Sequence, residues 1–334
     1  MTRLDAISNF LGLRRSTVGM LLMVILVGMG ERMAERFLPI YLIALGGGAL
    51  SIGLLNGLDN LLSALYAFPG GYLSDRLGTK RSLLVFNVIA MVGYLIVIVV
   101  PHWQAVIIGA IFFLSWSAIS LPATMSLIAR VLPMNKRTMG VSMHSLVRRI
   151  PMALGPILGG VCIAIWGERG GVRMAFVFAL ILAVVATMLQ QILIENESSK
   201  QVNGNTDSIA EKSPFRMFRF MRPALKRLLV CDILVRFCEQ IPYAFVVVWS
   251  MKSITHPVSA VQFGFLTGIE MVTAMLVYIP VAYLADKNTK KPFVVITFAI
   301  FTFFPLVLFF CQTFTWLVFA FILRGFNEFC EATR

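Results

Sequence analysis

Charged residues are scarce in this chain of 334 residues. They make up 13% of the sequence, about half the share usual in soluble globular domains, whereas hydrophobic residues make up 58% and the mean hydropathy is +0.85. A folded chain this poor in charge could not cover its surface with polar groups in water. The composition therefore excludes a soluble globule, a disordered chain and a coiled coil, and it predicts an all-α integral membrane protein.

Several patterns that carry chemistry are also missing. The five cysteines have neither zinc-type spacing nor the spacing of a disulfide framework. A G-x-x-x-x-G-K-[ST] nucleotide loop is absent, and so is the Asp-rich run that a prenyl or lipid transferase would need for metal-diphosphate binding. We therefore expect no enzyme, no metal site and no cofactor, and a proton or ion gradient as the driving force of any transport.

Long apolar runs dominate what is present. A bilayer core of about 30 Å needs about 20 apolar residues per helix, and the chain holds ten segments of that kind. They are 16–45, 50–74, 82–100, 105–129, 138–166, 172–194, 228–250, 261–285, 292–311 and 314–334.

The basic residues indicate the orientation of these segments. Of 29 Lys and Arg residues, twenty lie at the N-terminus, in alternate loops on the same side and at Arg334, and the opposite side holds only Arg169, Arg173 and Lys252. Because cytoplasmic loops carry the excess of positive charge, the N-terminus is expected in the cytoplasm. The net charge of +13 is then an orientation signal, and no aromatic or glycine pattern beside it suggests a nucleic-acid partner.

The loop 195–227 is polar and divides the chain. We expect a cytoplasmic segment at 1–15, a six-helix half at 16–194, a cytoplasmic linker at 195–227 and a second half at 228–334. The second half holds four segments where the first holds six. We therefore expect about ten transmembrane helices here and about two missing at the C-terminal end.

An internal repeat relates the two halves. A shift of 211 residues lays 57–76 over 268–287 without a gap. Gly57, Leu65, Pro69, Tyr72, Leu73 and Asp75 recur as Gly268, Leu276, Pro280, Tyr283, Leu284 and Asp286, Asp59 recurs as Glu270, and Arg76 as Lys287. Both segments run in the same direction, so the halves are predicted to be parallel, pseudo-symmetric repeats.

The loop after the second segment, GYLSDRLGTKRSL at 71–83, resembles the cytoplasmic loop signature of the major facilitator superfamily. The resemblance implies a bundle of two six-helix halves and a secondary transporter with a small-molecule substrate, acting as a monomer in the lipid bilayer. In such a transporter the loop and its repeat would help to gate the cavity. Its residues here are Gly71, Asp75, Arg76, Gly78, Lys80 and Arg81, with Asp286 and Lys287 in the repeat.

A second pattern, GPILGG in the fifth segment, resembles the core of a motif of proton-driven antiporters. Its residues are Gly155, Pro156, Gly159 and Gly160, while Ser142 and Pro151 stand in place of the upstream glycines. Small residues allow close helix packing, and we expect at least that role here.

Charges inside the apolar segments are the strongest functional signal. Each costs about 2.5–3.5 kcal/mol at a helix centre on insertion scales, so each should be paired or face a water-filled cavity. The candidates for a substrate or proton pathway are Glu31, Arg32, Glu35, Arg36, Asp59, Arg148, Arg149, Arg236, Glu239, Glu270, Arg324 and Glu328. Asp232 and Glu331, near the cytoplasmic ends, are instead expected in structural salt bridges, an alternative that stays open for the others.

These observations favour a permease of the plasma membrane, or of the inner membrane in a bacterium, that works by alternating access. Proton-coupled efflux of drug-like or organic-anion compounds leads the hypotheses, with uptake of an organic anion as the alternative. The alternative of another class is a membrane sensor or scaffold that does not transport.

Overall fold

The computed structural model describes residues 15–114, 116–131, 137–194, 227, 230–231, 234, 243–287 and 291–327. Within these ranges the chain forms helices joined by short turns, without a strand. The helices of the first half are α2 (Arg15–Glu35), α3 (Leu38–Ala44), α4 (Ala49–Leu77), α5 (Thr79–Val99), α6 (Trp103–Phe113), α7 (Trp116–Val131) and α8 (Arg137–Leu193). The second half contributes residues 243–248, the π-helical turn η2 (Trp249–Ser253), α11 (Ala260–Lys287), α12 (Lys291–Phe310) and α13 (Phe314–Asn327).

The all-α membrane architecture predicted from composition is confirmed. Among the described residues, three helical stretches are long and apolar enough to cross a membrane, namely Thr79–Val99, His144–Leu193 and Ala260–Val277. Of the predicted seventh segment, 228–250, the structure describes mainly the last turns, from residue 243 onward.

The first predicted segment, 16–45, is not one helix. It breaks at Arg36 and Phe37, and α3 begins at Leu38 with Pro39 in its first turn. Proline lacks an N–H donor, and its ring clashes with the carbonyl four residues earlier, here that of Glu35. The break therefore falls where α2 ends, beside the charged residues that the sequence singled out.

Helix α8 contains the fifth and sixth predicted segments. Its backbone leaves the helical region at Gly167 (φ 72°, ψ 176°), between the predicted ends 166 and 172. A residue with a side chain adopts this positive φ only with strain, so glycine fixes the turn. The dihedral angles stay helical at Pro151 and Pro156.

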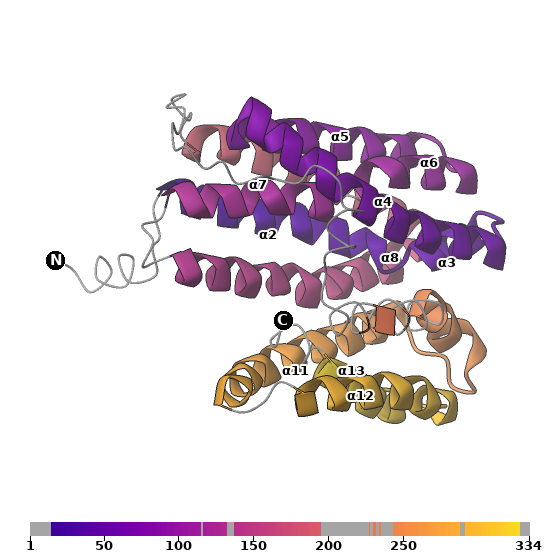
Figure 1. The fold of residues 1–334 in the computed structure, drawn as a ribbon. Helices are drawn as coiled ribbons and strands as arrows, with labels where there is room; N and C mark the ends of the chain where they lie inside the picture. Colours follow the sequence, from indigo (N-terminus) through magenta and orange to yellow (C-terminus); the bar gives the residue numbers. More distant parts are fainter. Residues whose placement is uncertain are drawn as a thin grey trace, which may run out of the picture.

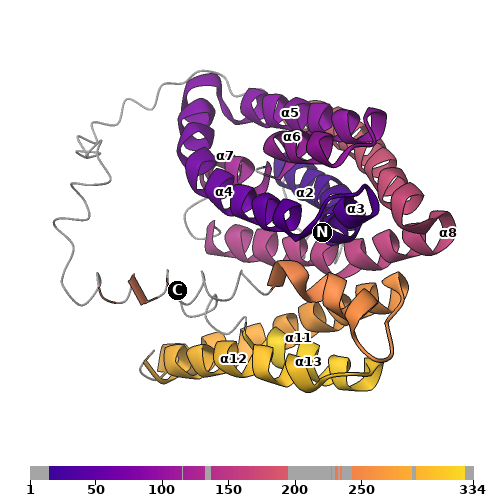
Figure 2. The same cartoon turned by 90° about the vertical axis from the view of Figure 1, so that its right-hand side faces the viewer.

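The two halves form adjacent layers that meet along α8. Figure 1 shows α11, α12 and α13 on one side of the first half, and in the turned view of Figure 2 α8 lies next to α11. Helix α2 packs mainly against α8 inside the first half. Helices α4 and α11 begin at Ala49 and Ala260, and these positions are separated by the offset of the sequence repeat.

The glycines of the fifth segment lie at the tightest of these contacts. A Cβ atom at Gly155 would come within 2.6 Å of the Arg32 Cβ, and one at Gly159 would overlap the Met33 carbonyl. On the other side, a Cβ at Gly160 would overlap the carbonyl of Ala260 in α11. Small residues thus let α8 lie against α2 and α11 with backbones nearly touching.

Gly159→Val is expected to lower the melting temperature and the yield of folded protein, because the new side chain has no room beside Met33. The matched control is Ala164→Val on the exposed face of the same helix, where added methyl groups meet no packed neighbour. Thermal unfolding of both purified variants in detergent checks this. Equal melting temperatures would show that the close approach of α8 and α2 is not needed for stability.

Candidate functional site

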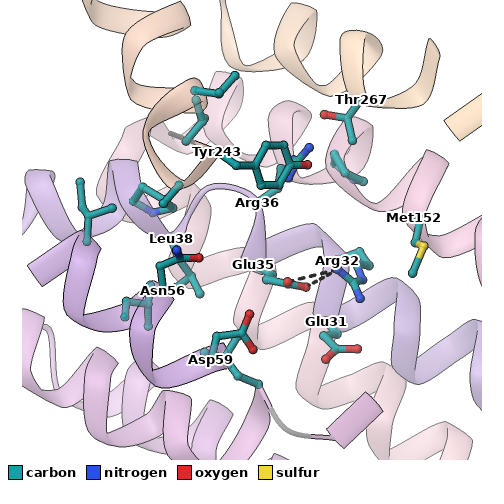
Figure 3. Close-up of a pocket in the computed structure, with 18 of the residues that line it drawn as sticks. Glu31, Arg32, Glu35, Arg36, Leu38, Asn56, Asp59, Met152, Tyr243 and Thr267 are labelled. Atoms are coloured by element: carbon teal, nitrogen blue, oxygen red, sulfur yellow. Dashed lines mark hydrogen bonds and ion pairs between the residues drawn. The ribbon is translucent and has the colours of Figure 1, made fainter. Parts of the chain in front are cut away.

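A cavity of about 340 Å³ lies where the two halves meet. Its walls come from α2, α3, α4 and α8 of the first half and from residues 243–247 and α11 of the second (Figure 3). Its polar lining residues include Glu31, Arg32, Glu35, Arg36, Asn56, Asp59, Ser63, Tyr243 and Thr267. The structure thus brings five of the predicted pathway charges to one cavity.

The break after α2 positions the first charges of this cavity. Arg32 and Glu35 form an ion pair one turn apart, with 2.9 Å between Nη1 and Oε2. Arg36 lies in the turn itself and points away from this pair, toward the second half (Figure 3). A continuous helix would have placed Arg32 and Arg36 on the same face, one turn apart; here the two side chains instead reach different carboxylates, those of Glu35 and Glu270.

Glu270 of α11 joins the two halves through its carboxylate. Its Oε1 accepts a 2.7 Å hydrogen bond from Nε of Arg324 in α13, and its Oε2 lies 3.4 Å from an Nη of Arg36. Only 3% of the Glu270 side chain is exposed, and 10% of Arg324. One buried carboxylate is thus shared by two guanidinium groups, one from each half.

The ring of Tyr243 contacts both of these arginines. The guanidinium carbon is 3.4 Å from the ring centroid for Arg324 and 4.3 Å for Arg36, and Arg324 also lies 5.1 Å from the centroid of Phe304. Such cation–π contacts contribute about 0.5–2 kcal/mol each. They help to hold two like charges close together in a dry environment. No sequence pattern singled out Tyr243, because a lone tyrosine in an apolar segment carries no signal of its own.

Asp59 of α4 lies across the cavity from Arg36 (Figure 3). It is half-buried and, among the described residues, makes no hydrogen bond or ion pair. Although Asp59 and Glu270 are equivalent in the repeat, one carboxylate faces the cavity and the other is enclosed by two arginines.

A second cavity of about 20 Å³ lies inside the first half, next to the part of the large cavity that Glu31 and Arg32 line. Glu31 and Arg32 line both cavities, and His144 and Arg148 of α8 line only the small one. Ser120 and Thr124 of α7 add hydroxyl groups to it. Its volume and polar lining suit about one water molecule.

The loop motif that the sequence predicted to gate the cavity lies at the end of α4. Gly78 (φ 80°) joins α4 to α5, and the Lys80 ammonium donates a 2.8 Å hydrogen bond to the Gln191 carbonyl in the last turn of α8. A cation at a helix C-terminus is favourable. A buried network continues from Gln190 through Asn87 to Trp116, with donor–acceptor distances of 2.8 Å.

Other predicted residues are apart from the cavity or outside the described part of the chain. Arg149 is buried but lines neither cavity. Asp232, Arg236, Glu239, Glu328 and Glu331 lie outside the described residues, as do the side chains of Asp75, Asp286 and Lys287. The roles predicted for them stay predictions.

Comparison with known proteins finds a matching family model and several related sequences. Residues 20–332 match the family model of the Major Facilitator Superfamily. The quinolone resistance protein NorA of Staphylococcus aureus strain MRSA252 is 24% identical over 181 residues, which are 54% of this chain and 45% of NorA. NorA of strain Mu50 is 23% identical over the same length. The chain thus aligns with less than half the length of these curated relatives.

Solved structures of transporters share the fold. A bacterial homologue of the human lysosomal transporter Spinster, in an inward-facing and occupied conformation, superposes with a TM-score of 0.73 at 15% identity, covering 96% of this chain and 73% of that one. The nucleoside transporter NupG also gives 0.73 at 15% identity, covering 96% of this chain and 81% of its own. Identities this low support the fold alone.

Glu270→Gln is expected to destabilise the protein strongly, because Arg36 and Arg324 would keep their charges but lose the buried carboxylate that they share. Removing one partner of a buried ion pair costs about 3–5 kcal/mol. Glu168→Gln is the matched control, since Glu168 pairs with Lys252 at 3.0 Å but both side chains are more than one-third exposed, and such pairs contribute about 0–1 kcal/mol. Melting temperatures compare the two, and equal losses would contradict a special role for Glu270.

Proposed function

Because the chain belongs to the major facilitator superfamily, we propose that it is a secondary transporter that moves a small organic solute across the membrane by alternating access. Proton-coupled efflux of drug-like or organic-anion compounds is the form that we favour. The single observation that carries the proposal is the charged cavity between the halves, because its walls would separate and re-form when the halves rock against each other.

Contacts on one side of the cavity support such a motion. Phe37 packs against Phe263 across the halves with ring centroids 6.0 Å apart, and Lys252 pairs with Glu168 near the turn at Gly167. If the positive-inside orientation holds, these contacts close the outer side. The cavity would then be reached from the cytoplasm, as an exporter requires when it loads its substrate.

The carboxylates of the cavity support proton coupling. Glu35 is paired with Arg32 at the wall of the cavity, and rocking of the halves would change its exposure to water and to that arginine. A carboxylate whose surroundings alternate in this way can take up a proton in one state and release it in the other. The relative NorA supports the outward direction, since it is named as a quinolone resistance protein and export of a drug is one way to resist it.

Two other functions compete with this proposal. Uptake of an organic anion would use the same cavity and its arginines, and a sensor or scaffold would bind a solute without moving it. Counterflow of labelled solutes in proteoliposomes separates transport from binding. A gradient of protons imposed in either direction then separates efflux from uptake.

Glu35→Gln is expected to abolish uphill accumulation driven by a proton gradient while exchange of substrate persists, because exchange needs only the substrate site. The measurement combines uphill transport, exchange and melting temperature in one set of reconstituted samples. Thr187→Ala serves as the control and should leave all three unchanged, because the Thr187 hydroxyl donates its hydrogen bond to the Ala183 carbonyl of its own helix and Thr187 lines neither cavity.

The alternative outcome is equally distinct. If Glu35 only neutralises Arg32, its loss strands a charge, and exchange and thermal stability should fall together with uphill transport. That result would remove Glu35 from the coupling mechanism and leave it a structural partner.

The proposed orientation predicts which positions a membrane-impermeant thiol reagent reaches from outside the cell. In a variant without native cysteines, Gly48→Cys should be labelled and Ser208→Cys in the linker should be protected until the membrane is permeabilised. Gly48 suits this test because a Cβ there meets no atom within 4 Å. The reverse pattern at both positions would invert the topology.

A further inference from the structure

The charges that line the large cavity fall into two groups. Glu31, Glu35 and Asp59 lie together with Arg32 on one side, and Arg36 lies beside Tyr243 on the other (Figure 3). The rest of the lining is largely apolar and includes Leu38, Ile52, Leu55, Leu114, Met152, Phe263 and Met271. A solute in this cavity therefore meets an acidic region, a basic region and an apolar wall.

Asp59 is the least compensated carboxylate of the acidic region. Glu35 is neutralised by Arg32 at 2.9 Å, and Glu31 shares the small second cavity with Arg148. For Asp59 the described part of the chain supplies neither an ion pair nor a hydrogen bond. An anion at this depth needs a positive partner or water, and a cationic group on the solute would meet that need.

Arg36 is the least compensated guanidinium of the basic region. It shares the Glu270 carboxylate with Arg324, and its own contact is the longer one, 3.4 Å against 2.7 Å. Its buried Nε–H has no hydrogen-bond acceptor within the described residues. The guanidinium donates to Glu270 through one Nη and lines the cavity, and a planar guanidinium suits a carboxylate or a similar oxyanion.

We infer that the cavity takes an amphipathic zwitterion, with a cationic group at Asp59, an anionic group at Arg36 and an apolar body against the wall between them. This inference rests on the proposed function, because it names the substrate class of the same cavity. A solute with one charge would compensate only one of these two groups, so a solute with both charges is expected to bind most tightly.

One scaffold in three charge states tests the inference. The probe is 4′-(aminomethyl)biphenyl-4-carboxylic acid, its methyl ester is the cation and its N-acetyl derivative is the anion. Isothermal titration calorimetry with the purified protein should show the zwitterion binding at least about tenfold more tightly than either derivative, the effect of one charge-assisted hydrogen bond. Equal affinity of the ester or the N-acetyl compound would overturn the inference, and so would no binding of any of the three.

Two variants assign the ends of the solute. Arg36→Gln should reduce the affinity for the zwitterion to that for the ester and leave the affinity for the ester unchanged. Asp59→Asn should reduce the affinity for the zwitterion to that for the N-acetyl compound and leave the affinity for the N-acetyl compound unchanged. If Arg36→Gln does not fold, Arg36→Lys keeps the charge but loses the paired donors and should weaken only the two carboxylate-bearing probes. Equal weakening of all three probes by either variant would contradict the assignment.

Transport is measured separately on the same preparation. Tight binding of the zwitterion without counterflow would contradict the proposed transport function and support the inferred preference of the cavity. Proton-driven transport of another solute, without preference for the zwitterion, would support the transport function and contradict the inferred preference.

Discussion

The shared carboxylate of Glu270 is the interaction on which the arrangement of the cavity depends. Two arginines converge on it from different halves, Arg324 at 2.7 Å and Arg36 at 3.4 Å. Without that carboxylate, the two like charges would lose the buried anion that they share. Glu270 therefore holds the turn after α2 against α11 and α13, and this contact forms one side of the cavity.

The sequence predicted the all-α membrane fold, most of the described helices and five charged residues of the cavity wall, because these follow from local patterns. Apolar length marked the segments, and the glycines of the fifth segment marked a close helix contact. Charges in apolar surroundings marked Glu31 to Arg36, Asp59 and Glu270. A charge inside an apolar segment is visible in the sequence alone, so these residues could be selected without knowing the tertiary structure.

The partners of those charges could not be predicted in the same way. Arg36 and Glu270 are 234 residues apart in the sequence, and nothing local to either residue indicates the other. Pro39 follows the break after α2, but a proline alone does not predict a break in this chain, because α8 continues through Pro151 and Pro156. The role of Tyr243 depends on both arginines being in place, so it follows only from the tertiary structure.

Equivalent residues of the repeat have different surroundings, and this difference bears on how the cavity would change. Gly264 and Gly268 of α11 lie against Pro156 and Ile157 of α8, whereas a Cβ at their equivalents in α4, Gly53 and Gly57, would meet no described atom within 4 Å. The same asymmetry applies to the acids, because Glu270 is enclosed while Asp59 faces the cavity.

In the proposed rocking motion, Glu270 would stay with Arg324, its nearer partner within the second half, and release Arg36. Within the protein, the positive charge of Arg36 would then be compensated only from its own half, which also carries Glu31, Glu35 and Asp59. Separation of the halves would thus remove the contact between Arg36 and Glu270. An anionic group of the solute, or the acids of the first half, would then compensate the charge of Arg36.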